Sequence, residues 1–376
     1  MTVEGRCAPR FAAVRRLLAE RLASGADVGA SVCVIRDGDV LVDLWGGLAD
    51  AERGIPWTAD TLVNTYSLTK TMTALVALAL VDRGALDPDA PVAEYWPEFA
   101  AAGKQDVLVR HVLGHTSGVC TWADPISLPE LYDARAAAAK LAAQPPRWTP
   151  GDGSGYQAIN HGHLVGEIVR RITGRSLGTV LREEFCAPAG ADYWLGAPDD
   201  VHPRVAALVA APPPAGAPRA TGLAAEVLGN PVVPPSITGT RPFLAAEIGG
   251  MNGQGNARSV AELQSVVSHG GVRDGHRFLS EDVLERIFDV QSSGVDRVLG
   301  VPLRFGLGYA LPAPAAMPAV PRGRVCWWTG FGGSVVVNDL DRRLTVAYVM
   351  NRLHRPLIGA PNATAYLDAV YAAADR

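Results

Sequence analysis

Residues 67–81 read SLTKTMTALVALALV and are apolar on almost every side beyond Lys70. A helix without a polar face is buried all round, so this stretch predicts a central helix from Thr69 to Val81. Lys70 is one of only three lysines in the chain, which carries nearly all of its positive charge on arginine. Burial among apolar neighbours penalises the ammonium form and lowers the pKa of a lysine. The resulting neutral amine is a competent general base.

Ser67 precedes this lysine by three residues, and side chains at i and i+3 meet on one face of a helix. The hydroxyl is therefore expected within hydrogen-bond reach of the amine, as an activated nucleophile requires. The start of a helix also offers unpaired backbone N–H groups and a positive dipole end, which stabilise an oxyanion. The alternative is a helix-capping serine beside a lysine that extends to solvent. The apolar context and the scarcity of lysine favour the catalytic interpretation.

Strand-like segments lie at both ends of the chain. Ala30 to Ile35 and Val40 to Trp45 flank an Asp-Gly turn and predict a hairpin. Before this hairpin, Phe11 to Leu22 has apolar residues at helical spacing, and Met1 to Leu22 as a whole resembles an amphipathic helix more than a signal peptide. Further predicted elements are strands at residues 324–328, 334–338 and 344–350 and a closing helix at residues 363–373.

The middle of the chain has a different pattern. Residues 86–240 contain helical pieces joined by Pro- and Gly-rich loops, such as Ala211 to Pro218. Strands at both ends with helices between them predict a discontinuous sheet domain of residues 1–85 and 241–376 and an inserted helical domain of residues 86–240. The expected fold class is α/β (α+β), with an antiparallel sheet flanked by helices and a cleft between the two domains.

The SLTK tetrad at 67–70 resembles the Ser-x-x-Lys motif of the serine β-lactamase and penicillin-binding protein superfamily. VRHVLGHTSG at 109–118 is similar to a helix and turn of class C β-lactamase-like esterases, and residues 148–174 are similar to the segment that carries their catalytic tyrosine. Residues 305–309 and 328–334 continue the match in the same order. The resemblance implies a β-lactamase/transpeptidase-like fold.

The resemblance also implies roles for residues distant from the tetrad. Tyr156 would exchange protons with Ser67 and the leaving group, as a phenolate or through Lys70. The alternative is a loop tyrosine that only packs its ring. The backbone N–H of Phe331 would join that of Ser67 as an oxyanion hole.

The segment Trp328-Thr329-Gly330 falls where the family has Lys-Thr-Gly or His-x-Gly, on an edge strand that lines the cleft and contacts substrate. Trp328 therefore replaces a residue that would pair with a substrate carboxylate. A second departure is Tyr156-Gln157-Ala158, in which alanine stands where β-lactamases have asparagine. Both departures argue against a β-lactam substrate and resemble the family VIII carboxylesterases, which hydrolyse small esters.

We therefore expect a serine hydrolase that forms an acyl-enzyme on Ser67 and acts as a carboxylesterase on small molecules. An acyltransferase, a cyclising thioesterase or an amide or lactam hydrolase remains open on the same scaffold. Its substrate would be a small-molecule ester, thioester or amide. A relative that only binds a peptide or ligand is the alternative from another class, and the presence of all three reactive side chains argues against it.

Composition excludes other classes of function. A net charge of −4 without any Lys/Arg run argues against nucleic acid as a partner. Five scattered cysteines without a Cys-x-x-Cys pair indicate a reducing compartment and no zinc site, and we expect neither a metal nor another cofactor. No segment predicts a signal peptide or a transmembrane helix, so we expect a cytoplasmic protein without a membrane partner. No pattern indicates an oligomeric state.

Two other local patterns contain residue types that occur in metal-binding and phosphate-binding sites. His161 and His163 have no third ligand nearby in sequence, so a metal site there is disfavoured. GGMNGQG at 249–255 lacks the lysine and the preceding strand of a phosphate loop and predicts a glycine-rich turn that lines the cleft.

Overall fold

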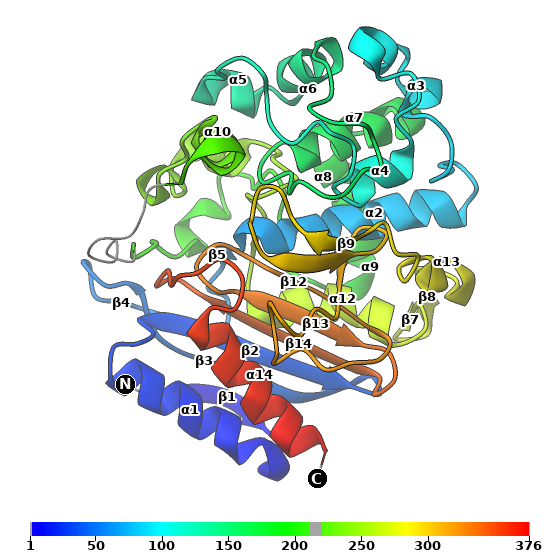
Figure 1. The fold of residues 1–376 in the computed structure, drawn as a ribbon. Helices are drawn as coiled ribbons and strands as arrows, with labels where there is room; N and C mark the ends of the chain where they lie inside the picture. Colours follow the sequence, from blue (N-terminus) through cyan, green and yellow to red (C-terminus); the bar gives the residue numbers. More distant parts are fainter. Residues whose placement is uncertain (1, 211–219, 376) are drawn as a thin grey trace.

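The computed structural model describes residues 2–210 and 220–375 (Figure 1). A ten-stranded antiparallel sheet forms its centre, in the order β1-β3-β2-β14-β13-β12-β11-β10-β9, with β4 paired to β3. The strands are β1 (Val3–Cys7), β2 (Gly29–Arg36), β3 (Asp39–Asp50), β4 (Ile55–Pro56), β9 (Ser292–Val295), β10 (Pro302–Phe305), β11 (Ala310–Leu311), β12 (Val325–Thr329), β13 (Val335–Asp339) and β14 (Leu344–Met350). The loop expected at Ala211 to Pro218 lies outside the described residues.

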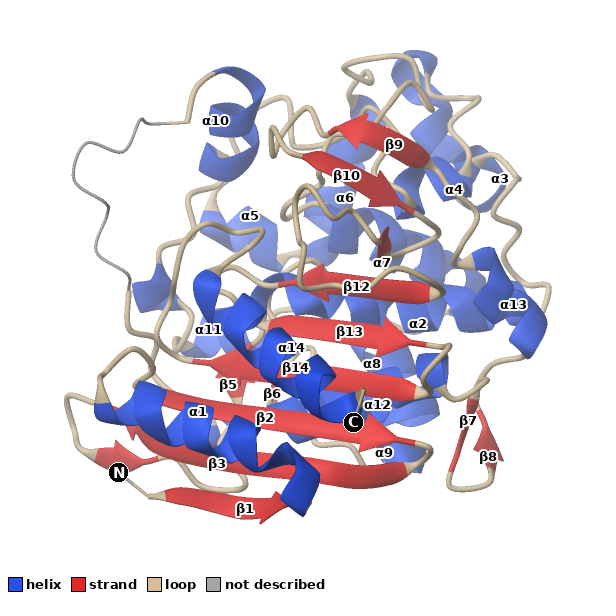
Figure 2. Ribbon diagram, turned by 60° about the horizontal axis from the view of Figure 1, so that its bottom comes forward, coloured by secondary structure: helices blue, strands red, loops and turns tan. Residues whose placement is uncertain are grey.

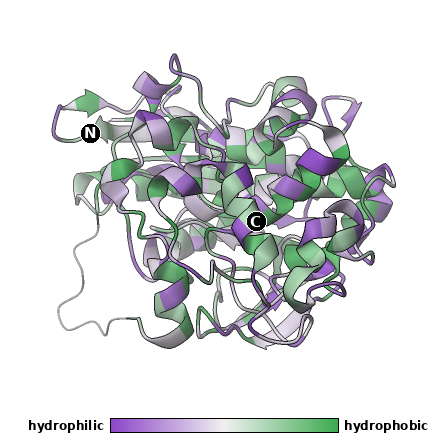
Figure 3. Ribbon diagram, turned by 90° about the horizontal axis from the view of Figure 1, so that it is seen from above, coloured by the Kyte–Doolittle hydropathy of each residue, from purple (hydrophilic) through white to green (hydrophobic). Residues whose placement is uncertain are grey.

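Helices cover both faces of this sheet, as Figure 2 shows. On one face α1 (Ala12–Ala23) and α14 (Pro361–Ala374) contact each other, and on the other α12 (Ala257–Ser268) packs against β2, β13 and β14. Every residue of β13 and β14 is buried, because strands between two helical layers have no face toward solvent. Most helices alternate between hydrophobic and hydrophilic segments (Figure 3), as helices with one face on a core do.

The segment between β3 and α12 is mainly helical. It contains the turn η2 (Tyr66–Leu68) and α2 (Thr69–Asp82), α3 (Val92–Tyr95), α4 (Val109–Leu113), α5 (Leu128–Tyr132), α6 (Ala134–Ala143), α7 (His161–Thr173), α8 (Leu177–Leu181), a π-helical turn (Arg182–Cys186), α9 (Ala187–Ala189), α10 (Gly222–Gly229) and α11 (Arg241–Ala245). Two short strands, β5 (Val63–Asn64) and β6 (Gln254–Gly255), pair where the chain leaves and re-enters the sheet region. The remaining elements are α13 (Glu281–Arg286) and a hairpin of β7 (Val272–Arg273) and β8 (His276–Arg277).

The predicted fold class, the hairpin, the last three strands, the central helix and the closing helix are confirmed. The helix expected over Met1 to Leu22 is wrong in its first part, where β1 pairs with the outer edge of β3. Its sequence, VEGRC, is mostly exposed and polar, so it has no alternating pattern that would predict a strand.

The prediction that Trp328 lies on an edge strand is also wrong. β11 pairs with β12 through Ala310 and Trp327, and β10 and β9 extend the sheet further. These added strands are short and contain proline and glycine, which hides them in the sequence. The division of the chain into residues 1–85 with 241–376 and an inserted 86–240 stays a prediction, since one buried core runs through both parts. In the described part of the chain, no helix is both long and apolar enough to cross a bilayer.

Candidate active site

Ser67 lies in the 3-10 turn η2, directly before α2. The preceding residue, Tyr66, has a φ of +47°, a left-handed conformation that is unfavourable for any side chain larger than glycine. A hydrogen bond of 3.0 Å from the Tyr66 N–H to Asn64 Oδ1 holds this conformation. Backbone strain of this kind concentrates at functional sites, because only a surrounding structure built for it maintains it.

Lys70 is buried on the next turn of the helix, with Nζ 3.2 Å from Ser67 Oγ. Its Nζ also donates hydrogen bonds to the carbonyl oxygens of Ala158 (2.7 Å) and Gly250 (2.6 Å), which are 88 and 180 residues away in sequence. Burial lowers the pKa of Lys70 well below its ordinary value. The expectation of purely apolar surroundings is therefore corrected, because two backbone carbonyls reach the amine.

These carbonyls match the needs of a neutral lysine. An uncharged amine has two N–H donors and one lone pair. The two carbonyls accept hydrogen bonds from Nζ, and Ser67 Oγ lies 3.2 Å away in a third direction, which is where a neutral amine would carry its lone pair. The amine of Lys70 is thus oriented to receive the proton of the Ser67 hydroxyl.

The glycine-rich turn at 249–253 reaches Lys70 because the β5-β6 ladder returns the chain beside Ser67. The Thr65 N–H donates to the Gly253 carbonyl at 2.9 Å, which fixes the turn against η2. A Cβ atom at Gly162 on α7 would collide with the backbone of Gly249 and Gly250. Only glycine at position 162 therefore permits the approach that brings the Gly250 carbonyl to the amine.

Tyr156 lies beside both groups and is almost completely buried. Its ring centroid is 4.7 Å from Lys70 Nζ, and its hydroxyl accepts a hydrogen bond of 3.2 Å from Trp328 Nε1. Burial raises the pKa of the Tyr156 phenol above its ordinary value, and hydrogen bonds to Ser67 and Trp328 oppose the rise only in part. Tyr156 is therefore a neutral phenol at neutral pH, suited to relaying a proton and not to acting as a standing phenolate.

A wall of rings packs behind Tyr156. The His115 ring lies 5.1 Å from that of Tyr156, 4.9 Å from that of His161 and 4.8 Å from that of Phe305, measured between centroids. Its Nδ1 is 3.0 Å from Gln157 Oε1, so His115 contacts a segment 42 residues further along the chain. Burial, with Lys70 nearby, lowers the pKa of His115 to about 3, so the wall is uncharged.

Two residues that line the same cavity, Ser67 and Phe331, have backbone N–H groups that can bind an oxyanion. The first hydrogen bond of η2 runs from the Leu68 N–H to the Thr65 carbonyl (3.2 Å), so the Ser67 amide has no partner within the turn. Phe331 lies within a tight turn, which is closed by a hydrogen bond of 2.8 Å from the Gly330 N–H to the Ser334 carbonyl. Within the described residues, no acceptor lies against the Phe331 N–H. Both amides are thus free to bind an oxyanion.

A cavity of about 290 Å³ opens beside Ser67 and Tyr156. Phe331 lines it, whereas Trp328, Thr329 and Gly330 do not. Trp328 is 3% exposed, donates its indole N–H to the Tyr156 hydroxyl and packs against the ring of Phe305. Thr329 Oγ1 donates to the Leu357 carbonyl at 3.0 Å. The predicted contact of Trp328 with substrate stays a prediction, and the contact that the structure shows is with Tyr156.

Sequence reasoning missed three contributors to this site. The carbonyls of Ala158 and Gly250 carry no side-chain signal, and only the glycine-rich character of residues 249–255 pointed to the turn. His115 was noted for its position in HTSG, but its contact with Tyr156 arises from packing between distant segments.

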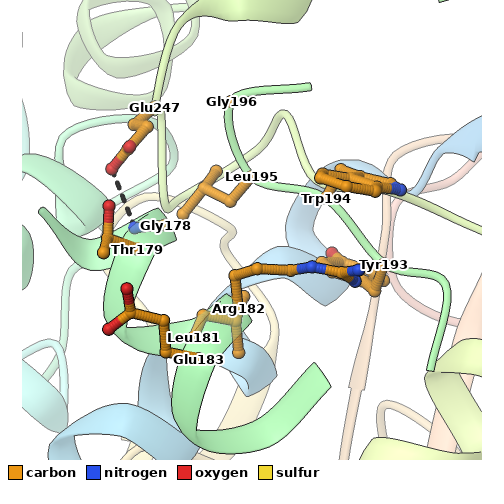
Figure 4. Close-up of a pocket in the computed structure, with 10 residues that line it drawn as sticks. All are labelled: Gly178, Thr179, Leu181, Arg182, Glu183, Tyr193, Trp194, Leu195, Gly196 and Glu247. Atoms are coloured by element: carbon orange, nitrogen blue, oxygen red, sulfur yellow. Dashed lines mark hydrogen bonds between the residues drawn. The ribbon is translucent and has the colours of Figure 1, made fainter. Parts of the chain in front are cut away.

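A second cavity of about 270 Å³ lies at the π-helical turn (Figure 4). The Arg182 guanidinium packs 4.2 Å from the centroid of the Trp194 ring, and Glu247 accepts hydrogen bonds from the Gly178 N–H (2.8 Å) and Ser176 Oγ (2.7 Å). Tyr193 separates this cavity from the Ser67 helix, since its hydroxyl is 2.8 Å from Thr65 Oγ1.

Comparison with known proteins places these features in context. A profile of the β-lactamase family matches residues 14–371. The esterase/beta-lactamase LipL of Mycobacterium tuberculosis is 35% identical, covering 95% of this chain and 84% of that protein. The esterase EstB of Burkholderia gladioli is 30% identical, covering 92% of this chain and 91% of that protein. The crystal structure of a family VIII carboxylesterase superposes with a TM-score of 0.93 at 37% identity, covering 99% of this chain and 100% of the other.

Proposed function

The chain belongs to the β-lactamase family, and from that premise we propose that it is a serine carboxylesterase that hydrolyses small-molecule esters through an acyl-enzyme on Ser67. The observation that carries the proposal is the pairing of Ser67 Oγ with a buried amine 3.2 Å away, at the wall of a cavity. A nucleophile next to a base of lowered pKa is the arrangement that acyl transfer requires.

In the first half of the reaction Ser67 Oγ attacks the ester carbonyl carbon, and its proton passes to the Lys70 amine. The carbonyl oxygen becomes an oxyanion that accepts hydrogen bonds from the N–H groups of Ser67 and Phe331. When the tetrahedral intermediate collapses, the C–O bond to the alcohol breaks, and the alkoxide takes the proton of the Tyr156 hydroxyl. Lys70 returns its extra proton to Tyr156, which restores both neutral groups.

In the second half a water molecule replaces the departed alcohol. Its oxygen attacks the acyl carbon, its proton passes through Tyr156 to Lys70, and the same amides hold the oxyanion. The bond between the acyl group and Ser67 Oγ then breaks, and Oγ regains its proton from Lys70. The carboxylic acid leaves, and the site is as it began.

Esters suit this cavity better than β-lactams do. Ala158 offers a methyl group where the lactamase motif has an amide, and the Trp328 indole is committed to Tyr156. Most of the cavity lining is apolar, with Ile159, Met251 and Leu357 among it. Acyl transfer, thioester cyclisation and amide hydrolysis share the chemistry up to the acyl-enzyme and differ in the acceptor that follows.

The test is intact-mass detection of the acyl-enzyme with a fluorophosphonate and with 4-nitrophenyl esters, β-lactams and thioesters. We expect one adduct on wild-type protein with the fluorophosphonate, and faster turnover of short-chain nitrophenyl esters than of a chromogenic β-lactam. Absence of an adduct on folded protein would instead support a relative that only binds its ligand. Faster β-lactam turnover would contradict the carboxylesterase assignment, and products with added amines would identify an acyltransferase.

A cytoplasmic location also stays a proposal. It rests on five cysteines, all of them within the described residues and none in a disulfide. Cell fractionation with an antibody to this chain would test it, and recovery outside the cytoplasm would contradict it.

A further inference from the structure

The lining of the Ser67 cavity contains a single charged side chain among the described residues, that of Arg355. Around it the lining is largely apolar and includes Leu228, Val233, Met251 and Leu357. In the described part of the chain no carboxylate forms an ion pair with Arg355, and no hydrogen bond occupies its guanidinium. Other arginines are engaged, for example Arg147 with Glu226 at 2.6 Å.

The backbone on either side of Arg355 is anchored. The His354 N–H donates to the Gly332 carbonyl at 3.0 Å, and His354 Nε2 lies 2.8 Å from the Ala26 carbonyl. On the other side, the Leu357 carbonyl accepts from Thr329 Oγ1 at 3.0 Å. The segment between β14 and α14 is thus tied to the turn that carries Phe331, which fixes the backbone around Arg355, while the exposed Arg355 side chain lies at the cavity wall.

A guanidinium in this setting has a clear preference for its partner. It presents paired N–H donors that match the two oxygens of a carboxylate, and such charge-assisted pairs are stronger than neutral hydrogen bonds. Arg355 itself is exposed, and the lining between it and Ser67 is largely apolar, so among the described residues there the cation is the one charged group that can select the charge of a substrate. A substrate that fills both features has an apolar chain with a carboxylate at one end and the ester carbonyl at the other.

On the basis of the proposed esterase function, we propose that Arg355 binds a carboxylate on the substrate, and that the preferred substrates are half-esters of dicarboxylic acids with a short methylene chain. In the related β-lactamases the residue at the position of Trp328 pairs with a substrate carboxylate. Here that role would pass to Arg355, in the segment between β14 and α14.

The test compares two esters of equal chain length, 4-nitrophenyl hexanoate and the mono-4-nitrophenyl ester of adipic acid. The readout is the ratio of kcat/KM for the adipate to that for the hexanoate, corrected for spontaneous hydrolysis. In Arg355→Gln we expect this ratio to fall about tenfold, mainly through a higher KM for the adipate, because one charge-assisted contact is lost. Raising the salt concentration should lower the wild-type ratio, since a partly exposed ion pair is screened.

Charge reversal sharpens the result. Arg355→Glu should lower the ratio further and favour 4-nitrophenyl 6-(trimethylammonio)hexanoate over hexanoate. Arg322→Gln removes an exposed arginine away from the cavity and is the matched control, which should keep the wild-type ratio. Hydrolysis of both esters with equal ratios in wild type and Arg355→Gln would overturn the role of Arg355. Failure of wild-type protein to hydrolyse either ester would instead contradict the esterase proposal itself.

Discussion

The cavity beside Ser67 and the cavity beside Arg182 have nearly the same volume, about 290 and 270 Å³, yet their charged and polar groups are arranged differently. At the Arg182 cavity each charge is balanced locally. Glu247 caps α8, the Glu183 carboxylate pairs with Arg175 at 2.7 Å, and Arg182 lies over an indole ring. Among the described residues that line this cavity, no residue other than glycine has a positive φ and no buried polar side-chain atom lacks a hydrogen-bond partner.

The Ser67 cavity concentrates groups that cost stability. Tyr66 has a strained backbone, and its buried hydroxyl has no hydrogen-bond partner among the described residues. Lys70 is buried without a counter-ion, and neither ring nitrogen of His161 finds a partner in the described part of the chain. Volume alone does not identify a site, whereas unfavourable states maintained by the surrounding fold do. The following changes test that distinction, in order of the expected effect.

Ser67→Ala should have the largest effect. Without the hydroxyl no acyl-enzyme can form, so ester turnover should fall by about 10⁶-fold, the scale seen when a serine nucleophile is removed. Intact mass after fluorophosphonate treatment should show no adduct. Ser24→Ala, on an exposed serine far from the cavity, is the control that should label normally. A Ser67→Ala protein that still labels would place the nucleophile elsewhere.

Lys70→Ala should slow acylation by about 10²- to 10⁴-fold, the range for a lost general base. Lys70→Arg should be as poor, because a guanidinium does not release its proton at neutral pH. Burial lowers the pKa of Lys70, so wild-type acylation should persist at neutral pH and fall on acidification as the amine becomes protonated. The measurement is the pH profile of single-turnover acylation. A wild-type rate in Lys70→Ala would contradict the role of the amine.

The lowered pKa of Lys70 should also make the stability of the protein depend on pH. The folded-state pKa of Lys70 lies below its ordinary value of 10.5, so between these two values the unfolded chain binds more protons. The free energy of unfolding should therefore rise with pH across that interval through this residue. Urea titrations at several pH values should show a smaller rise in Lys70→Met than in wild type, and an equal rise would contradict a depressed pKa.

Tyr156→Phe should lower kcat by about 10²-fold, because the ring still packs while proton relay to the leaving alcohol is lost. Esters with a poor leaving group should suffer more than nitrophenyl esters, whose leaving group needs no proton. Equal losses for both would indicate that the Tyr156 hydroxyl only positions the substrate. Trp328→Phe serves as a milder comparison, since it removes the N–H that bonds the Tyr156 hydroxyl but keeps an aromatic ring.

The sequence predicted most of the residues that form the Ser67 site, and it predicted the central strands of the sheet. The pairing of Ser67 with Lys70 follows from helical spacing alone, and both the spacing and the burial are local properties. The strands β2, β3 and β12 to β14 also carried a local pattern. Tyr156 could be placed only through resemblance, because a loop tyrosine has no distinctive spacing.

Other features of the site could not be predicted from the sequence, because they arise where segments distant along the chain pack together. The carbonyl of Gly250 meets Lys70 only after β5 pairs with β6, and neither two-residue strand has a pattern of its own. Trp328 was expected on an edge strand, but β11 pairs with β12, and the Trp328 indole bonds Tyr156 from a segment 172 residues away. Arg355 gained significance only when the loop after β14 was seen in the cavity wall.

Arg182→Gln should have the smallest effect on activity. It tests the expectation that the Arg182 cavity plays no part in ester hydrolysis. Loss of a half-exposed guanidinium over Trp194 should reduce stability by no more than about 1 kcal/mol and leave kcat/KM for esters unchanged. Thermal unfolding and nitrophenyl ester kinetics measure both quantities. A large loss of activity in a folded Arg182→Gln protein would break the distinction drawn above. It would mean that this cavity acts on Ser67 through Tyr193, whose hydroxyl lies 2.8 Å from Thr65 Oγ1 at the start of the catalytic turn.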